Sequence, residues 1–312
     1  IDPFMGVEEA ARRRDFTMNA MMRDALTGAL IDRFGGQADI QNRVIRHVDE
    51  RTFRRDPLRA IRAAQFAARL EFTIAPETMA LCRTLDLDGL ARERVMGEME
   101  KALTRSRRPS RCFEALREMG QLELWVKEVA ALIGVKQRAD CHPEGDAWTH
   151  TMLVVDEAAK LRDEAKKPAG LMLAALLHDV GKAVAMQEKD GVIHAYGHET
   201  AGVPLAEEFL RRLTGEKALC CYVLNMVELH MKPNLYAAQN SGQKAWNRLF
   251  DRSACPEDLL LLAKADHRGR INAAPYAETE RTIRARLSAY EEMMARPHIT
   301  GADLLARGIQ PG

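Results

Sequence analysis

The spacing of apolar residues along the chain predicts a mostly helical protein. In residues 56–70, Leu58 and Ile61 begin a helical repeat of apolar side chains, with Asp56 expected as the N-cap and Pro57 as the first helical residue. Residues 169–179 are apolar nearly all round, which predicts a buried helix. We expect further helices at 76–85, 91–104, 109–120, 149–165, 200–213, 217–231, 257–267 and 276–295.

The pattern near the N-terminus is different. Residues 7–24 indicate a helical or mixed segment, and residues 28–48 alternate between apolar and polar with a break at Gly35 and Gly36. That alternation predicts two short strands around a turn. Residues 190–200 indicate a loop or a small hairpin. The expected fold is therefore mainly α, with a small α/β part at the N-terminus.

Length and composition narrow the class of protein. The 312 residues, 46% of them apolar, suffice for two or three domains. No apolar run approaches 18 residues and no signal-peptide pattern opens the chain, so we expect neither a membrane span nor secretion. The six cysteines form no CxxC pair and indicate reduced thiols in a cytoplasmic protein. Residues 1–4 precede a methionine and are interpreted as an expression scar.

Charge is informative in its distribution, because the net charge is only +1. Residues 43–69 hold eight arginines against three acidic residues. A second group of arginines follows at Arg105, Arg107, Arg108 and Arg111. Such stripes suit contacts with phosphates, although solvated helix faces would give the same pattern.

A histidine and an aspartate end the most apolar segment of the chain. His178 and Asp179 directly follow a buried run, where an imidazole and a carboxylate cost several kcal/mol unless compensated. A divalent cation compensates both, and adjacent helical residues can reach one ion beyond the helix end. His150 lies on the buried face of the preceding helix, and Asp266 lies on the apolar face of a later helix.

Mixed nitrogen and oxygen ligands indicate Mg, Mn, Ni, Fe or Zn rather than a thiolate site. The order H…HD…D resembles that of the HD superfamily of metal-dependent phosphohydrolases, over about residues 142–285. The resemblance implies that His150, His178, Asp179 and Asp266 bind a divalent ion such as Mg, Mn or Ni. Taken singly, each histidine could be a hydrogen-bonded core residue, and Asp266 could be a helix cap.

Further residues are assigned by the same resemblance. Asp179 and Lys182 are expected to be catalytic, with Lys182 neutralising a substrate phosphate; the alternative is an exposed lysine at a helix end. His198 and His230 would bind a second ion or contact the substrate. Three other histidines of this half are expected at the surface: His194, His267 and His298.

Five further motifs resemble those of the bacterial tRNA nucleotidyltransferases (CCA-adding) and poly(A) polymerases, a family in which an HD domain is often fused behind the neck. They are RRDFTMNA (13–20), DRFGGQADI (32–40), RDPLRAIRAAQFAARL (55–70), ARERVMGEMEKAL (91–103) and ITGADLLARGIQPG (299–312). The resemblance implies four parts. They are a remnant of the nucleotidyltransferase head (5–49), a helical nucleotide-recognition and neck region (50–133), the HD domain (134–290) and a truncated C-terminal element (291–312).

The resemblance also implies a nucleotide site. Asp56 and Arg59, one helical turn apart, would read the Watson–Crick edge of ATP or CTP, and Arg62 would contact phosphate. The alternative for Asp56 and Arg59 is a surface ion pair. The helix motif of the family begins with Glu-Asp, whereas this chain has Arg55 before Asp56, which removes one acidic contact.

Arg14, Asp15 and Asn19 would contact the ribose and the triphosphate; a solvated basic stretch is the alternative. The head of the family carries a Gly-rich strand and a spaced pair of aspartates that hold two Mg ions. We identify neither in the 312 residues, and the sequence DLD at 86–88 is interpreted as surface. We therefore expect that the chain does not add nucleotides by itself.

Three functions follow from these residues. The first is an HD-type phosphohydrolase acting on phosphomonoesters or 2′,3′-cyclic phosphates, including those at RNA 3′ ends. The second is a CCA-adding nucleotidyltransferase that uses ATP and CTP, with the head supplied elsewhere. The third is a non-catalytic module that binds tRNA through its arginine stripes. The expected partner in each case is tRNA or another RNA 3′ end.

Overall fold

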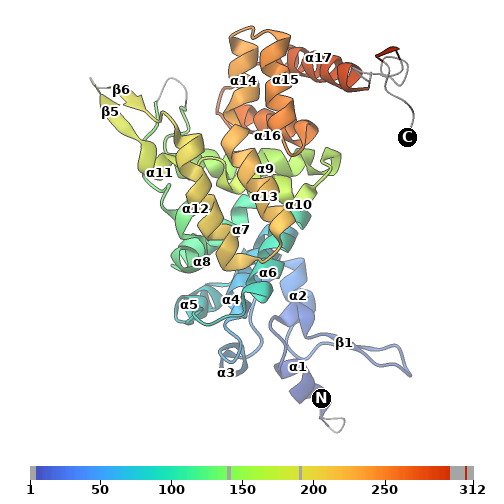
Figure 1. Ribbon diagram of the computed structural model, residues 1–312. Coiled ribbons are helices and arrows are strands. Elements are labelled where there is room, and N and C mark those ends of the chain that lie inside the picture. The colour runs from blue at the N-terminus through green and yellow to red at the C-terminus, as the bar shows by residue number, and fades with distance from the viewer. Residues whose placement is uncertain (1–4, 139–141, 190–191, 296–305, 308–312) are drawn as a thin grey trace.

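The fold is mainly helical, as expected, with a small α/β region at the N-terminus. The computed structural model describes residues 5–138, 142–189, 192–295 and 306–307. The N-terminal elements and the helices α14 (Met231–Ala238) and α15 (Gln243–Arg252) lie at opposite ends of the molecule (Figure 1). Residues 1–4, His298 and most of the predicted C-terminal element (291–312) lie outside the described residues.

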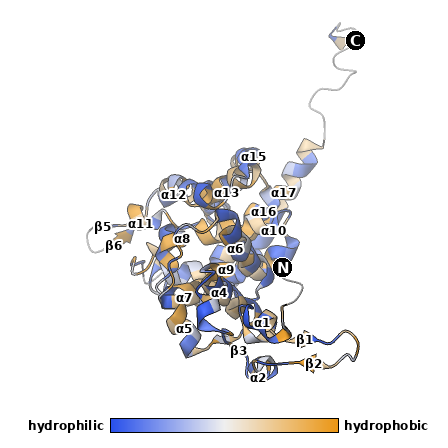
Figure 2. Ribbon diagram, turned by 90° about the horizontal axis from the view of Figure 1, so that it is seen from below, coloured by the Kyte–Doolittle hydropathy of each residue, from blue (hydrophilic) through white to orange (hydrophobic). Residues whose placement is uncertain are grey.

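Short elements form the N-terminal region. Strand β1 (Met22–Arg23) pairs antiparallel with β2 (Leu30–Ile31), and β3 (Val44–Ile45) pairs parallel with β4 (Thr73–Ile74). The β1–β2 hairpin extends sideways from the helical body in both ribbon views (Figures 1 and 2). The helices of this region are α1 (Val7–Arg12), η1 (Thr17–Asn19), α2 (Gly36–Gln41) and α3 (Glu50–Phe53).

Two short strands lie on either side of Gly35 and Gly36, as expected, but the predicted turn between them is wrong. A helix, α2, begins at Gly36, and it separates β2 from β3, each of which pairs with a different strand. The carboxylate of Asp32 accepts hydrogen bonds from the backbone N–H groups of Gly36 and Gln37, at 2.8 and 2.9 Å. Gly35 adopts a left-handed conformation with φ of 74°. These bonds satisfy the first amides of a helix, so local capping prevails over the alternating pattern.

The middle of the chain is a layer of packed helices. They are α4 (Leu58–Leu70), α5 (Pro76–Arg83), α6 (Arg92–Arg105), α7 (Ser110–Glu118) and α8 (Leu122–Ala130). Helix α4 packs against α6 and α7. The predicted cap at Asp56 is wrong, because α4 begins at Leu58 after Pro57, and the Asp56 carboxylate accepts a hydrogen bond from Arg94 instead. Asp86 and Asp88 are exposed, as expected.

The second half is a bundle around one buried helix, α10 (Pro168–Leu177). Every residue of α10 from Gly170 to Leu177 is buried, and the helix packs against its neighbours on several sides, as the all-round apolar pattern predicts. The other helices are α9 (Ala147–Leu161), η2 (Arg162–Glu164), α11 (Lys182–Ala185), α12 (His198–Leu213), α13 (Lys217–Leu229), α14, α15, α16 (Pro256–Arg268) and α17 (Ala277–Met294). Strands β5 (Gln187–Lys189) and β6 (Val192–His194) form the small hairpin.

The sequence predicts no membrane-spanning helix and reduced cysteines, and the structure bears on both. Among the described residues, no helix has both the length and the apolar character needed to cross a membrane. The described cysteines carry free thiols: Cys82, Cys112, Cys220, Cys221 and Cys255.

Candidate metal centre and nucleotide site

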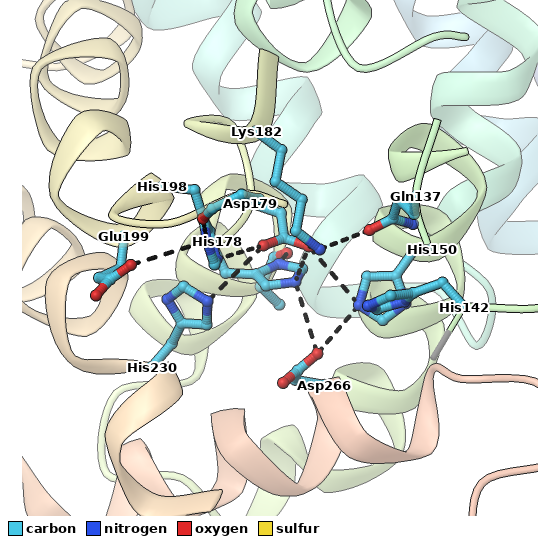
Figure 3. A network of polar contacts seen from close by, with 12 residues as sticks. Gln137, His142, His150, His178, Asp179, Lys182, His198, Glu199, His230 and Asp266 are labelled. Carbon is cyan, nitrogen blue, oxygen red and sulfur yellow. Dashed lines mark hydrogen bonds and ion pairs between the residues drawn. The ribbon is translucent and has the colours of Figure 1, made fainter. Parts of the chain in front are cut away.

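Three helices bring the four predicted ligands into one buried cluster (Figure 3). His150 comes from α9, His178 and Asp179 directly follow α10, and Asp266 comes from α16; at most 3% of each residue is exposed. The His150 Nε2 lies 3.0 Å from Asp266 Oδ1 and 3.8 Å from Asp179 Oδ2. The His178 Nε2 lies 3.2 Å from Asp179 Oδ2 and 4.0 Å from Asp266 Oδ1.

Each imidazole of the cluster is oriented by a partner on its far side. The Nδ1 atoms of His178, His198 and His230 each lie 2.7–2.8 Å from the backbone carbonyl oxygen three residues earlier. The Nδ1 of His150 lies 2.8 Å from a carboxylate oxygen of Glu144. The backbone carbonyl acceptors favour a proton on Nδ1 of His178, His198 and His230, so that the Nε2 of each can present a lone pair to an ion in the cluster.

Asp179 lies between two groups of ligands. Its Oδ2 faces His178, whereas its Oδ1 lies 3.2 Å from the Nε2 of His198 and 3.8 Å from the Nε2 of His230. The carboxylate therefore has one oxygen on each side. Two sets of three ligand atoms within 4.8 Å of one another result: His150, His178 and Asp266, and Asp179, His198 and His230.

The residues present fit a divalent cation. The Nε2 atoms of His178, His198 and His230 are buried and have no hydrogen-bond partner in the part of the chain that the structure describes. Several orphaned buried polar atoms at one place are unusual in folded proteins, because each costs about 1–3 kcal/mol. Imidazole and carboxylate donors without thiolates suit Mg, Mn, Ni, Fe or Zn.

The pKa shifts of the cluster differ from group to group. Burial alone would lower the pKa of His150 and His198, but their hydrogen bonds to Asp266 and Asp179 outweigh it and raise both. Burial alone would raise the pKa of Asp179, but attraction to His178 and Lys182 outweighs it and holds this pKa well below the ordinary value. The pKa of Asp266 is likewise held well below its ordinary value, because the hydrogen bond from His150 outweighs burial. Burial lowers the pKa of His230 to about 3. At neutral pH both carboxylates are therefore ionised and His230 is neutral.

Lys182 is buried, so the alternative of an exposed lysine at a helix end is wrong. Only 7% of it is exposed, and its Nζ lies 2.6 Å from Asp179 Oδ2 and 2.6 Å from Gln137 Oε1. A pocket of about 310 Å³ opens beside these residues. The pocket is lined in part by Gln137, His142, Asp179, Lys182, His198 and Arg270.

The nucleotide-site residues form a second network, around Asp15. The carboxylate of Asp15 accepts hydrogen bonds from Arg62, at 2.7 and 2.9 Å, and from the Asn19 amide at 3.0 Å. Arg62 also bonds the buried carboxylate of Glu98 on α6, at 3.0 Å. Arg62 is thus held between two carboxylates, and it links the N-terminal region to the neck.

Asp56 and Arg59 do not pair with each other in the structure. Asp56 is bonded to Arg94, and the Arg59 guanidinium donates to the backbone carbonyls of Thr52 and Arg13, at 2.9 and 2.7 Å. Arg14, the remaining residue predicted for this site, has an exposed side chain. Base reading by Asp56 and Arg59 stays a prediction that requires both side chains to exchange their present partners.

Comparison with known proteins identifies the family of the chain. Three family descriptions match: the poly A polymerase head domain over residues 4–46, the probable RNA and SrmB-binding site of polymerase A over 71–133, and the HD domain over 147–287. A multifunctional CCA protein of Burkholderia cenocepacia (strain HI2424) is 40% identical over 325 residues, which cover 98% of this chain and 74% of that protein. The chain belongs to the tRNA nucleotidyltransferase and poly(A) polymerase family, with a fused HD domain.

Solved structures of such nucleotidyltransferases share the fold. The Thermotoga maritima CCA-adding enzyme complexed with tRNA matches with a TM-score of 0.61 and 18% identity, over 98% of this chain and 66% of that one. A tRNA nucleotidyltransferase complexed with a primer tRNA and an incoming ATP analog matches with a TM-score of 0.59 and 20% identity, over 95% of this chain and 76% of that one. At these identities the likeness shows the fold alone.

The structure also brings residues to the metal centre that the sequence analysis did not single out. Glu144 Oε1 lies 2.8 Å from the Nδ1 of both His142 and His150, so one carboxylate orients two imidazoles. Arg270 lies 3.6 Å from Asp266, and Gln137 bonds Lys182. Gln137, His142 and Glu144 lie in the segment 134–147, which composition marks only as a boundary, so no periodicity points to them.

The predicted surface histidines are only partly as expected. His194 is half-buried, lines the pocket and stacks on Tyr196, so its assignment to the surface is wrong. His267 is also half-buried, with its Nε2 2.8 Å from the carbonyl oxygen of Ala274. Both side chains are held by tertiary contacts, and the pattern of residues along the sequence does not reveal such contacts.

Proposed function

We propose that this protein takes part in CCA addition at tRNA 3′ ends, with ATP and CTP as substrates. The observation that carries the proposal is the 40% identity, over 98% of the chain, to a relative called a multifunctional CCA protein. The shared fold with nucleotidyltransferases solved in complex with tRNA and with an ATP analog supports the same partners. This replaces the expectation that the chain adds no nucleotides, which the comparisons do not support.

The division of labour that we propose follows the predicted parts. The predicted head region (5–49) and neck (50–133) would face the nucleotide and the tRNA. The Asp15 network would position a ribose and triphosphate, and the exposed Arg105, Arg107 and Arg108 would contact tRNA phosphates. A cytoplasmic location stays a prediction.

The test is incorporation of radiolabelled CMP and AMP into tRNA that lacks its CCA end. We expect label in that tRNA and none in a tRNA whose CCA end is already complete. Absence of label from both tRNAs at saturating ATP, CTP and Mg²⁺ would overturn the proposal.

A second function is favoured by the orphaned imidazoles on either side of Asp179. We propose that the HD domain (134–290) hydrolyses phosphomonoesters or 2′,3′-cyclic phosphates with a divalent ion such as Mg, Mn or Ni. His150, His178, Asp179 and Asp266 would hold one ion. His198 and His230, with the second oxygen of Asp179, would hold another.

The chain and the ion would contribute different parts of the chemistry. A bound divalent ion lowers the pKa of water and polarises a phosphoryl oxygen. Lys182 would bind a phosphate oxygen, because its ammonium group lines the pocket and lies 2.6 Å from Asp179. The carbonyls and the Glu144 carboxylate that bind Nδ1 would keep the rings in the orientation that the ion needs.

His178→Ala tests this second function. Mn²⁺ at 100 times its dissociation constant stabilises a folded protein by about 2.7 kcal/mol. We expect the unsubstituted protein to show such a gain in thermal stability and to hydrolyse bis-p-nitrophenyl phosphate, and His178→Ala to lose both. His267→Ala removes a half-buried histidine of α16 that does not contact the centre, and it should retain both. Equal Mn²⁺ stabilisation of all three proteins would contradict the proposed ligand set.

A further inference from the structure

The pocket beside the metal centre has two chemically different ends. Asp179, Lys182 and Arg270 lie at the charged end, whereas His194 and Tyr196, in β6 and just after it, line the other end. In Figure 1 the β5–β6 hairpin projects beside α11 and the start of α12. The volume of about 310 Å³ is near the lower limit, roughly 300 Å³, of pockets that bind small molecules.

The charged end has donors that still lack an acceptor. The Nε2 of Gln137 and the Nε of Arg270 are buried and have no hydrogen-bond partner within the described residues. Gln137 is 6% exposed, and its side-chain oxygen is fixed by Lys182, so its amide nitrogen is left to donate (Figure 3). Unpaired buried donors beside an ammonium group suit an anion with several acceptor oxygens, such as a phosphate.

The other end offers an aromatic surface. The rings of His194 and Tyr196 are stacked, with centroids 4.9 Å apart and an interplanar angle of 14°. Tyr196 nevertheless remains 82% exposed, although it lines the pocket. His194 thus covers one face of a ring whose remaining surface is open. An exposed, supported aromatic ring is what proteins use to stack a nucleobase, at about 1–3 kcal/mol per base.

We propose that Tyr196, backed by His194, is a stacking platform for the nucleobase next to the phosphate that the centre hydrolyses. This rests on the proposed phosphohydrolase function. The phosphate would lie at the charged end, among Lys182 and the free donor of Gln137, and the base would lie on Tyr196. Tyr196 is then a specificity residue: it selects nucleotide substrates over phosphoesters that lack a base.

Steady-state hydrolysis with Mn²⁺ tests the platform on two substrates. One is adenosine 2′,3′-cyclic phosphate, and the other is methyl riboside 2′,3′-cyclic phosphate, which lacks the base. We expect Tyr196→Ala to raise KM for the first substrate roughly 5- to 100-fold with little change in kcat, and to leave KM for the second unchanged. Tyr196→Phe should keep the original KM, because the ring is retained.

Val184→Ala is the control for the loss of an exposed side chain near the pocket. Val184→Ala removes another exposed apolar side chain, 64% exposed, from the neighbouring α11 and should change neither KM. An unchanged KM for the cyclic nucleotide in Tyr196→Ala, or an equal rise for both substrates, overturns the platform.

If the unsubstituted protein hydrolyses neither substrate, the phosphohydrolase function fails, and calorimetric binding of adenosine 2′-monophosphate decides the platform. Binding that Tyr196→Ala weakens at least fivefold supports the platform. Binding that is absent, or equal in both proteins, overturns it.

Discussion

Gly181 lies where the chain after α10 passes closest to α12, and Gly181→Ala should disturb the metal centre without replacing a ligand. A Cβ atom at Gly181 would lie 2.0 Å from the backbone oxygen of His198 and 2.5 Å from the backbone nitrogen of Gly202. Both obstacles are main-chain atoms of α12, so no flexible side chain can move aside. The start of α12 must therefore shift.

The size of the effect follows from these distances. Relief of the contact requires α12 to move by more than about 1 Å, since non-bonded heavy atoms rest at roughly 3.5 Å. Overpacking of this kind costs about 1–3 kcal/mol of unfolding free energy. The shift carries His198, whose Nε2 lies 3.2 Å from Asp179, and metal ligands tolerate displacements of only about 0.2 Å. Affinity for Mn²⁺ at this side of the centre should fall about 10- to 100-fold.

Urea unfolding with and without Mn²⁺ measures both effects. Gly97→Ala is the matched control, because a Cβ at this position of α6 meets no atom within 4 Å; it should stabilise the protein by about 0.5–1 kcal/mol. The reasoning is refuted if the free energy of unfolding of Gly181→Ala lies within about 0.5 kcal/mol of that of the unsubstituted protein. It is also refuted if Mn²⁺ stabilises both proteins equally.

Two further predictions concern the N-terminal half. Arg62→Met leaves the buried carboxylates of Asp15 and Glu98 without their shared guanidinium and should cost about 1–3 kcal/mol in urea unfolding, whereas Arg54→Met, which breaks an exposed pair, should cost under about 0.5 kcal/mol. Equal costs would contradict the bridging role. Burial lowers the pKa of His47 below its ordinary 6.5, so the unfolded chain binds the proton more readily and stability falls as pH drops below about 6.5. Between about pH 7.5 and 5.5, the urea midpoint of unfolding should therefore fall less for His47→Gln than for the unsubstituted protein. An equal fall in both proteins would exclude His47 as the cause.

Helices with a clear apolar repeat could be predicted from the sequence, because that repeat is local. The buried segment at 169–179 corresponds to α10, and the segment at 257–267 corresponds to α16, each within two residues at either end. Helix α2 could not be predicted, because the bonds of Asp32 to the next amides stabilise a helix where the apolar pattern indicates a turn. Helix α8, with its non-helical Val126, also escaped the pattern.

The sequence by itself determined the family, the mainly helical fold and the kinds of ligand atom available, since motif order and apolar spacing are written along the chain. Only the tertiary structure decided which atoms meet. His150 and Asp266 are 116 positions apart, yet they lie 3.0 Å from each other because α9 and α16 pack together. The carboxylate of Glu144, the orphaned Nε2 atoms around Asp179 and the open ring of Tyr196 depend on such packing, which brings distant segments together with a geometry that no local pattern encodes.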